Sequence, residues 1–131
     1  MTTVLVDHNM EGQATRLWSM LAADGWLELV PLQLVTFAEV NLPVTSSDRV
    51  VWQFVQEQDM LLLTDNRNRK GLDSLERTIQ EESMPSSRPV LTIGNLGRVG
   101  EHGYRQRCAE RIVEIVPDLH GYLGAGRIFI P

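Results

Sequence analysis

The stretch Met60-Leu61-Leu62-Leu63-Thr64-Asp65-Asn66 is a short apolar run that ends directly in polar residues. An apolar run of this length is typical of a strand that is buried on both faces of a parallel sheet. Thr3-Val4-Leu5-Val6, followed by Asp7-His8-Asn9, has the same form near the start of the chain. We therefore expect two central strands, each with an aspartate at its C-terminal end.

Three further segments have strand character. Val90–Gly94 is a further apolar run, and Arg127–Ile130 closes the chain as an edge strand. A strand with an irregular start is expected within Leu27–Phe37, because Pro31 interrupts that stretch. A turn or short helix over 38–42 follows it.

Helical spacing of apolar residues fills the intervals between the expected strands. Strands that alternate with helices imply right-handed crossovers and a mostly parallel sheet that is covered on both faces. The expected fold class is α/β, a three-layer Rossmann-like domain with a central, mostly parallel sheet. Four helices are expected: one from Glu11 to a stop at Asp24-Gly25, one through Val50–Val55, one over Gly71–Glu82 and one over Tyr104–Val116. In the third, Leu72, Leu75 and Ile79 are expected to point inward.

The composition limits both the number of domains and the class of protein. The chain has 131 residues, of which 43% are hydrophobic, and this suits one domain over residues 1–131. Its apolar runs are far shorter than the ~18 residues that span a membrane, and its first residues lack the pattern of a signal peptide. A single cysteine, Cys108, excludes an internal disulfide and a multi-cysteine zinc site. We expect a cytoplasmic protein with no membrane partner.

The charge balance bears on nucleic acid as a partner. A formal net charge of -5 excludes a protein that coats nucleic acid tightly by electrostatics alone. The basic residues are eleven arginines and one lysine, and arginine is the better bidentate partner of phosphate. Arg67, Arg69 and Lys70 are the candidates for contacts to substrate phosphates. They fit equally well a solvated loop that balances the nearby acids.

Three aspartates are expected to converge at the carboxyl edge of the sheet, where parallel α/β sheets bind ligands. Asp7 and Asp65 follow the two central strands, and Asp48 begins the helix that crosses into the second of these strands. Asn9 and Asn66 add amide oxygens. Carboxylates in one pocket repel one another, and a divalent cation removes that conflict. Oxygen ligands favour Mg²⁺ or Mn²⁺, whereas the three histidines have no paired spacing for zinc.

Each of these residues also has an ordinary structural interpretation. Asp7 ends a strand, and Asn9 suits the cap of the next helix. Asp48 follows two serines and suits the N-cap position of its helix. Asp65-Asn66 is common turn chemistry. The functional interpretation rests on a coincidence, since two central strands both deliver an aspartate at the same edge.

The motifs and their order resemble those of the PIN-like family. Val4-Leu5-Val6-Asp7-His8-Asn9 is similar to the family's opening strand. Thr45–Trp52, followed by Gln56–Arg67, is similar to its core of Ser-Asp, helix, strand and Thr-x-Asp. The likeness is to small members related to toxin-type ribonucleases, including the DUF5615-type group. It covers roughly residues 3 to 70 as motif and the rest as topology.

The resemblance implies a metal-dependent ribonuclease that hydrolyses RNA phosphodiester bonds with water as the nucleophile. Asp7, Asp48 and Asp65 would be the catalytic residues and would hold one or two Mg²⁺ or Mn²⁺ ions. Asn9 and Glu39 would be further metal ligands, Glu39 as the acidic residue from an early helix. The toxin of a toxin–antitoxin pair is one setting, and it implies an antitoxin-like protein partner.

Two other hypotheses stay open. The chain has Asn66 and Asn68 where related sequences often have Asp, which lowers the negative charge available for a second ion. A catalytically degenerate PIN-like module for partner binding or dimerisation, such as a homodimer, is therefore the alternative. A HAD-like phosphatase is less favoured, because Asn9 stands where that mechanism needs a second Asp and Lys70 is the only lysine.

Overall fold

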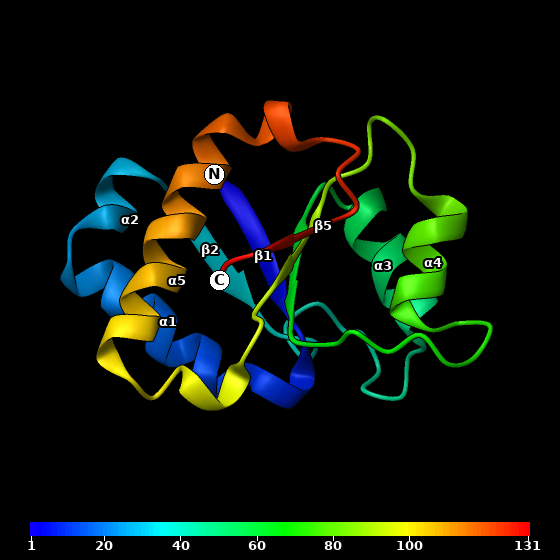
Figure 1. Cartoon of the computed structure of the whole chain (residues 1–131), viewed down its shortest axis with the longest axis horizontal. Helices are drawn as coiled ribbons and strands as arrows, with labels where there is room; N and C mark the ends of the chain where they lie inside the picture. Colours follow the sequence, from blue (N-terminus) through cyan, green and yellow to red (C-terminus); the bar gives the residue numbers. More distant parts are fainter.

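The computed structural model describes residues 1–131. Its five strands form one sheet (Figure 1). All neighbouring strands are parallel, and their order is β2-β1-β3-β4-β5. The expected parallel sheet is confirmed, and the last strand lies at an edge as expected. The strands are β1 (Thr2–Val6), β2 (Leu32–Val35), β3 (Leu61–Thr64), β4 (Val90–Thr92) and β5 (Arg127–Phe129).

Helices cover both faces of the sheet and make three layers. In Figure 1, α1, α2 and α5 lie on one side of the strands, and α3 and α4 lie on the other. The architecture is the Rossmann-like α/β arrangement that the sequence predicts. None of the helices is both long and apolar enough to cross a membrane. The helices are α1 (Glu11–Ala23), α2 (Trp26–Leu29), α3 (Asp48–Glu57), α4 (Leu75–Glu82) and α5 (His102–Ile115), with 3-10 helices η1 (His8–Met10), η2 (Leu96–Arg98) and η3 (Val116–Tyr122).

Successive residues of the buried strands supply two apolar clusters, one on each face of the sheet. On β3, Leu61 and Leu63 belong to the larger cluster, which also takes side chains from α1 and α5. Leu62 belongs to the smaller cluster, with side chains from α3 and α4. All three leucines are buried. Burying a leucine side chain stabilises a fold by about 1.5–3 kcal/mol, so this uninterrupted run holds both helical layers in place.

The stretch before β2 departs from the expected pattern. Trp26–Leu29 forms the short helix α2, not the irregular start of a strand. Gly25 adopts a φ of 77° and turns the chain after α1, a conformation that glycine tolerates best. Trp26 and Leu27 then pack against the larger apolar cluster. The strand β2 begins only after Pro31.

The helix expected over Gly71–Glu82 begins later, as α4 at Leu75. Gly71 has a φ of 96°, which is incompatible with a continuing right-handed helix. The Ser74 hydroxyl caps α4 by accepting a hydrogen bond from the backbone N–H of Arg77 at 3.3 Å. Leu72, expected inward, is 73% exposed. The segment before α4 is therefore part of the long loop that follows β3.

The carboxyl ends of β1 and β3 lie side by side where the strand order reverses. β1 pairs with β2 on one side and with β3 on the other. The backbone N–H of Asp7 donates to the carbonyl of Leu63 at 2.9 Å, and Thr64 pairs in register with Thr92 of β4. Open α/β sheets bind ligands at such a switch point. The fold thus places the ends of β1 and β3 at the position where a site is expected.

Candidate functional site

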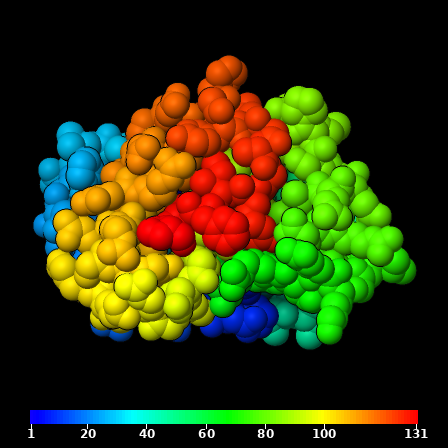
Figure 2. Space-filling model, in the orientation of Figure 1, coloured from blue at the N-terminus to red at the C-terminus, as the bar shows by residue number.

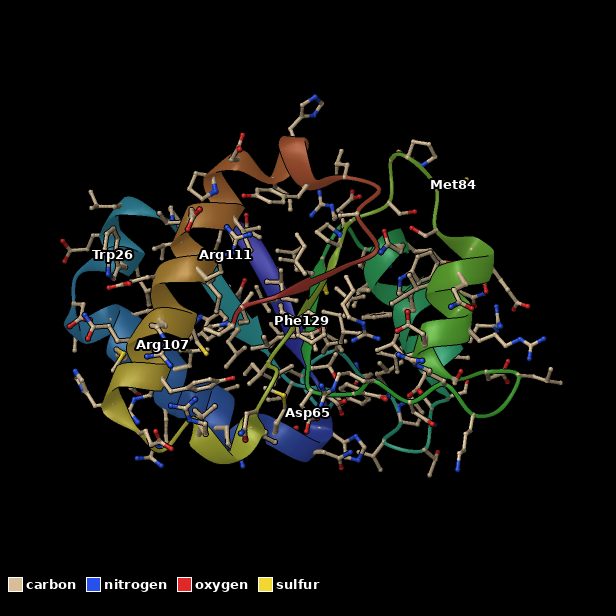
Figure 3. The ribbon with its side chains drawn as sticks, viewed as in Figure 1. Trp26, Asp65, Met84, Arg107, Arg111 and Phe129 are labelled. Carbon is tan, nitrogen blue, oxygen red and sulfur yellow. The ribbon has the colours of Figure 1, made fainter.

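A cavity of about 300 Å³ opens at the carboxyl edge of the sheet between β1 and β3, and we name it the carboxyl-edge pocket. Asp65, labelled in Figure 3, lies at this edge, directly after β3. Residues from five separate parts of the sequence line it, so it exists only in the folded chain. Of the residues expected at the site, it contains Asp7, Asn9, Asp48, Asp65 and Asn66. Its other polar lining residues are His8, Ser46 and Thr64.

Asp7 is fixed by hydrogen bonds on both carboxylate oxygens. Its Oδ2 accepts from the Thr64 hydroxyl at 2.7 Å, and its Oδ1 accepts from the backbone N–H of Asn9 at 3.4 Å. The His8 Nδ1 lies 3.6 Å from the same Oδ1, and the His8 ring packs against Phe37. Asp7 therefore caps η1 and faces the pocket at once. The structural and functional interpretations of this residue are compatible.

Asp48 is the first residue of α3 and not its N-cap. The cap is Ser47, whose hydroxyl accepts from the Val50 N–H at 3.2 Å. The Asp48 Oδ2 instead accepts from the Leu75 N–H of α4 at 3.0 Å. The expectation that Asp48 caps its own helix is therefore wrong, because the preceding serine fills that position. The carboxylate joins the N-terminal ends of α3 and α4 beside the pocket.

The Asp65 carboxylate accepts no hydrogen bond from the protein, although the residues that follow it are held by hydrogen bonds. The Asn66 N–H donates to the Thr64 hydroxyl at 3.0 Å. The Asn66 side-chain oxygen accepts from the Asn68 N–H at 2.8 Å, and the Asn68 side chain accepts from the Lys70 N–H at 3.1 Å. These are the local turns that asparagine forms readily. Asp65 is the carboxylate of the pocket with the greatest freedom to bind a ligand.

Glu39 does not lie among the lining residues of the pocket. Its carboxylate accepts from the backbone N–H of Thr36 at 3.0 Å and from the Thr36 hydroxyl at 3.1 Å. These bonds hold the turn that follows β2. The structure therefore brings together the three aspartates expected at the site but leaves Glu39 outside that group.

A basic loop, residues 67–70, follows the pocket residues in sequence. Arg67, Arg69 and Lys70 are exposed, and no carboxylate lies within 4.0 Å of any of them. Arg69 lines a separate surface depression beside α4 and not the pocket itself. The basic loop thus carries free positive charge next to an acidic pocket. Six other arginines are each paired with a carboxylate, namely Arg49, Arg77, Arg88, Arg98, Arg111 and Arg127.

Arg49, the neighbour of Asp48, fastens α3 to α4. Its guanidinium donates to Glu82, to Glu81 at 2.6 Å and to Asp73 at 3.0 Å. These carboxylates hold the pKa of Arg49 above its usual value. The pKa of Glu81 lies below 4.5 because of its bond to Arg49. The pKa of Glu82 is lowered by hydrogen bonds from the Gln53 amide and from Arg49.

The donor set of the pocket suits a hard divalent cation by its chemistry. The available ligand atoms are carboxylate, amide and hydroxyl oxygens, which magnesium and manganese prefer. No three His, Cys, Asp or Glu side chains stand close enough together to hold a metal ion by themselves. Mg²⁺ is usually held by one or two carboxylates together with water and substrate phosphate. The residues therefore fit a hydrated Mg²⁺ or Mn²⁺ and do not fit a structural zinc ion.

Cys108 takes no part in the site. It is buried in the larger apolar cluster on α5. Burial raises the pKa of its thiol to about 11. A thiol with so high a pKa is neither a nucleophile nor a metal ligand near neutral pH.

Two residues that shape the pocket were not expected from the sequence. Thr64 joins Asp7 to Asn66 through its hydroxyl. Arg127 of β5 donates to the Asn66 carbonyl at 2.8 Å across 61 positions of sequence. A charged residue at the start of an apolar strand was the available signal for Arg127. For Thr64 the signal was only its position at the end of a strand directly before Asp65, which is weak because threonine is common in buried strands.

Comparisons with family models, with curated proteins and with solved structures found no match for this chain.

Proposed function

We propose that this chain is a divalent-metal-dependent ribonuclease of PIN-like type, which hydrolyses RNA phosphodiester bonds. The observation that carries the proposal is the meeting of Asp7, Asp48 and Asp65 in one pocket at the carboxyl edge of the sheet. Three separate segments supply these aspartates, and each segment contains a motif that resembles the family. The choice of RNA as substrate rests on that resemblance.

Bound Mg²⁺ or Mn²⁺ supplies Lewis acidity toward the scissile phosphate and lowers the pKa of bound water. Asp65 offers both carboxylate oxygens, whereas Asp48 offers the oxygen that is not bonded to Leu75. Asp7 is oriented by the Thr64 hydroxyl. One or two of these carboxylates, together with water and substrate phosphate, would hold the ion, with Asn9 beside them.

The basic loop would bind phosphates on either side of the scissile bond. Arg67, Arg69 and Lys70 have no carboxylate partners, so a phosphate does not compete with an existing ion pair for them. Their charge also offsets repulsion between the acidic pocket and a polyanionic substrate. This arrangement accommodates a net charge of -5 on the chain, because phosphate contacts come from a few local cations.

The resemblance also supports a setting for the activity. A ribonuclease of this type in the cytoplasm needs restraint, and an antitoxin-like protein that covers the pocket or the basic loop would supply it. A single buried cysteine is in keeping with a reducing compartment.

The test is RNA cleavage by the purified protein with Mn²⁺, with Mg²⁺ and with a chelator, on single-stranded and structured RNA. The proposal expects cleavage only with metal and its loss in Asp7→Asn. Asp118→Asn is the control, because this carboxylate lies outside the pocket. Cleavage that persists in the chelator, or in Asp7→Asn, would contradict the proposal.

A second candidate function is a catalytically degenerate PIN-like module that binds a partner or forms a homodimer. Two observations favour it: Asp7 and Asp48 are both bonded within the fold, and no three metal-ligating side chains are clustered. This candidate expects no cleavage with any metal. It also expects a mass by light scattering that corresponds to a homodimer or to a complex with a partner.

A further inference from the structure

A buried arginine lies beside the segment that carries Asp65. Arg127, the first residue of β5, pairs in register with Val90 of β4. Directly paired residues point to the same face of a sheet, and Val90 belongs to the smaller apolar cluster beside α3 and α4. The Arg127 side chain is only 10% exposed. A charged group at such a position is costly unless it is paired and hydrogen-bonded.

The guanidinium of Arg127 bonds three separate elements. Its Nη2 donates to Glu76 Oε2 of α4 at 2.9 Å. Its Nη1 donates to the Asn66 carbonyl at 2.8 Å and to the Thr92 hydroxyl of β4 at 2.9 Å. The fork is planar, so bonds at both ends fix its orientation. Lysine, with one compact ammonium, cannot reproduce this geometry.

The backbone of Asn66 is consequently held on both sides. Its N–H donates to the Thr64 hydroxyl, and its carbonyl accepts from Arg127. The same Thr64 hydroxyl donates to Asp7. Hydrogen bonds thus run without interruption from β5 through the end of β3 to the end of β1. Asp65 lies within this path, with a fixed backbone and a free carboxylate.

Figure 2 presents the same relationship at the surface, where the C-terminal segment lies directly beside the residues that follow β3. We propose that Arg127 is a positioning residue of the carboxyl-edge pocket. It fixes the backbone of residues 65–66 and thereby sets where the Asp65 carboxylate lies relative to Asp7. The geometric part stands on the contacts alone, and only its consequence for metal binding rests on the proposed function.

A purely stabilising ion pair between Arg127 and Glu76 is the competing explanation. The two explanations differ in which contact matters. Glu76→Gln removes the charged partner but leaves the bonds to Asn66 and Thr92. Arg127→Met removes all three bonds, and Arg127→Lys keeps the charge but loses the fork.

The experiment combines amide hydrogen exchange with Mn²⁺ titration of the full chain. The reporting amides are those of Asn66, Asn68 and Lys70, all of which are bonded within the loop. We expect Arg127→Met to speed their exchange about tenfold while α1 and α5 keep wild-type rates. We expect its Mn²⁺ affinity to fall by about 10-fold, as for other groups that orient metal ligands. Glu76→Gln leaves both quantities within about twofold of wild type, and Arg127→Lys falls between.

Unchanged exchange at these amides in both Arg127 variants would overturn the positioning role. An equal rise across all helices would also overturn it, because it would indicate general destabilisation. If Arg127→Met does not fold, amide exchange and Mn²⁺ affinity are compared between Arg127→Lys and Glu76→Gln instead. A wild type that binds no Mn²⁺ contradicts the proposed function, whereas faster exchange confined to residues 65–70 still upholds the positioning role.

Discussion

Thr64 donates a 2.7 Å hydrogen bond from its hydroxyl to Oδ2 of Asp7 and so joins the carboxyl ends of β3 and β1. The hydroxyl is fully buried, and it also accepts from the Asn66 N–H. One oxygen atom therefore orients a candidate metal ligand and holds the backbone beside another. Neither role is available to valine, which has nearly the same shape.

Thr64→Val removes both bonds without opening a large cavity. We expect a loss of about 1–3 kcal/mol in the free energy of unfolding, because the Asn66 N–H and Asp7 lose a buried partner. We also expect slower RNA cleavage. Thr78→Val is the matched control, since Thr78 is equally buried but bonds only the Ser74 carbonyl in its own helix. Urea unfolding and cleavage rates measure the two effects, and equal cleavage by both variants would contradict this role of Thr64.

Two substitutions of Asp48 test its negative charge and its hydrogen bond separately. Asp48→Asn keeps an acceptor for the Leu75 N–H, so its free energy of unfolding should stay within about 1 kcal/mol of wild type. Asp48→Ala loses the acceptor and should be destabilised by about 1–3 kcal/mol. Both variants lose the carboxylate and should lose cleavage to the same extent. If Asp48→Asn retains full activity, Asp48 serves only to join α3 to α4.

The fold was predictable where the sequence pattern is local. The run that ends at Thr64 has no polar face, and this alone implies a central strand with helices on both sides. The stretch after Gly25 was less predictable, because short apolar stretches fit a strand or a helix equally well. The start of α4 was misplaced because helical spacing extends back to Leu72, whereas Gly71 has a positive φ and Ser74 caps the helix.

Part of the site was predictable, because the carboxyl ends of parallel strands meet at one edge of the sheet. Asp7 and Asp65 follow from that rule, and Asp48 follows from the crossover into β3. Glu39 was assigned by order along the chain, which says nothing of distance, and the structure leaves it outside the pocket. Arg127 stood out only as a charged residue at the start of an apolar strand, and its contact with Asn66 was not predictable because it depends on the pairing of β4 with β5.

Acid should weaken the link between α3 and α4. The pKa values of Glu81 and Glu82 are lowered in the folded chain, so their contribution to stability is present above about 4.5, the usual value. It is lost as the pH falls through the lowered values. In Arg49→Met the free energy of unfolding should therefore differ most from wild type at neutral pH, and the difference should shrink as the pH falls below the usual pKa of a glutamate. Urea unfolding across this range measures it, with Arg16→Met as a control expected to run parallel to wild type.

The basic loop should set the salt dependence of RNA binding. Replacing Arg67, Arg69 and Lys70 together with glutamine removes three proposed phosphate contacts. The slope of log affinity against log salt should then decrease by about 2 for single-stranded RNA. A triple variant of Arg88, Arg98 and Arg111 changes the net charge equally but leaves the basic loop intact. Equal slopes for the two triple variants would show that net charge alone matters.

The most direct test of the central claim is the rate of Mn²⁺-dependent cleavage of a labelled single-stranded RNA by wild type, Asp65→Asn and Glu39→Gln. Asp65 has the free carboxylate in the carboxyl-edge pocket, whereas Glu39 is bonded to Thr36 outside it. We predict that the wild type cleaves, that Asp65→Asn is slower by at least about 100-fold, and that Glu39→Gln matches the wild type. Equal rates for Asp65→Asn and the wild type, or cleavage by none of the three, would contradict the account.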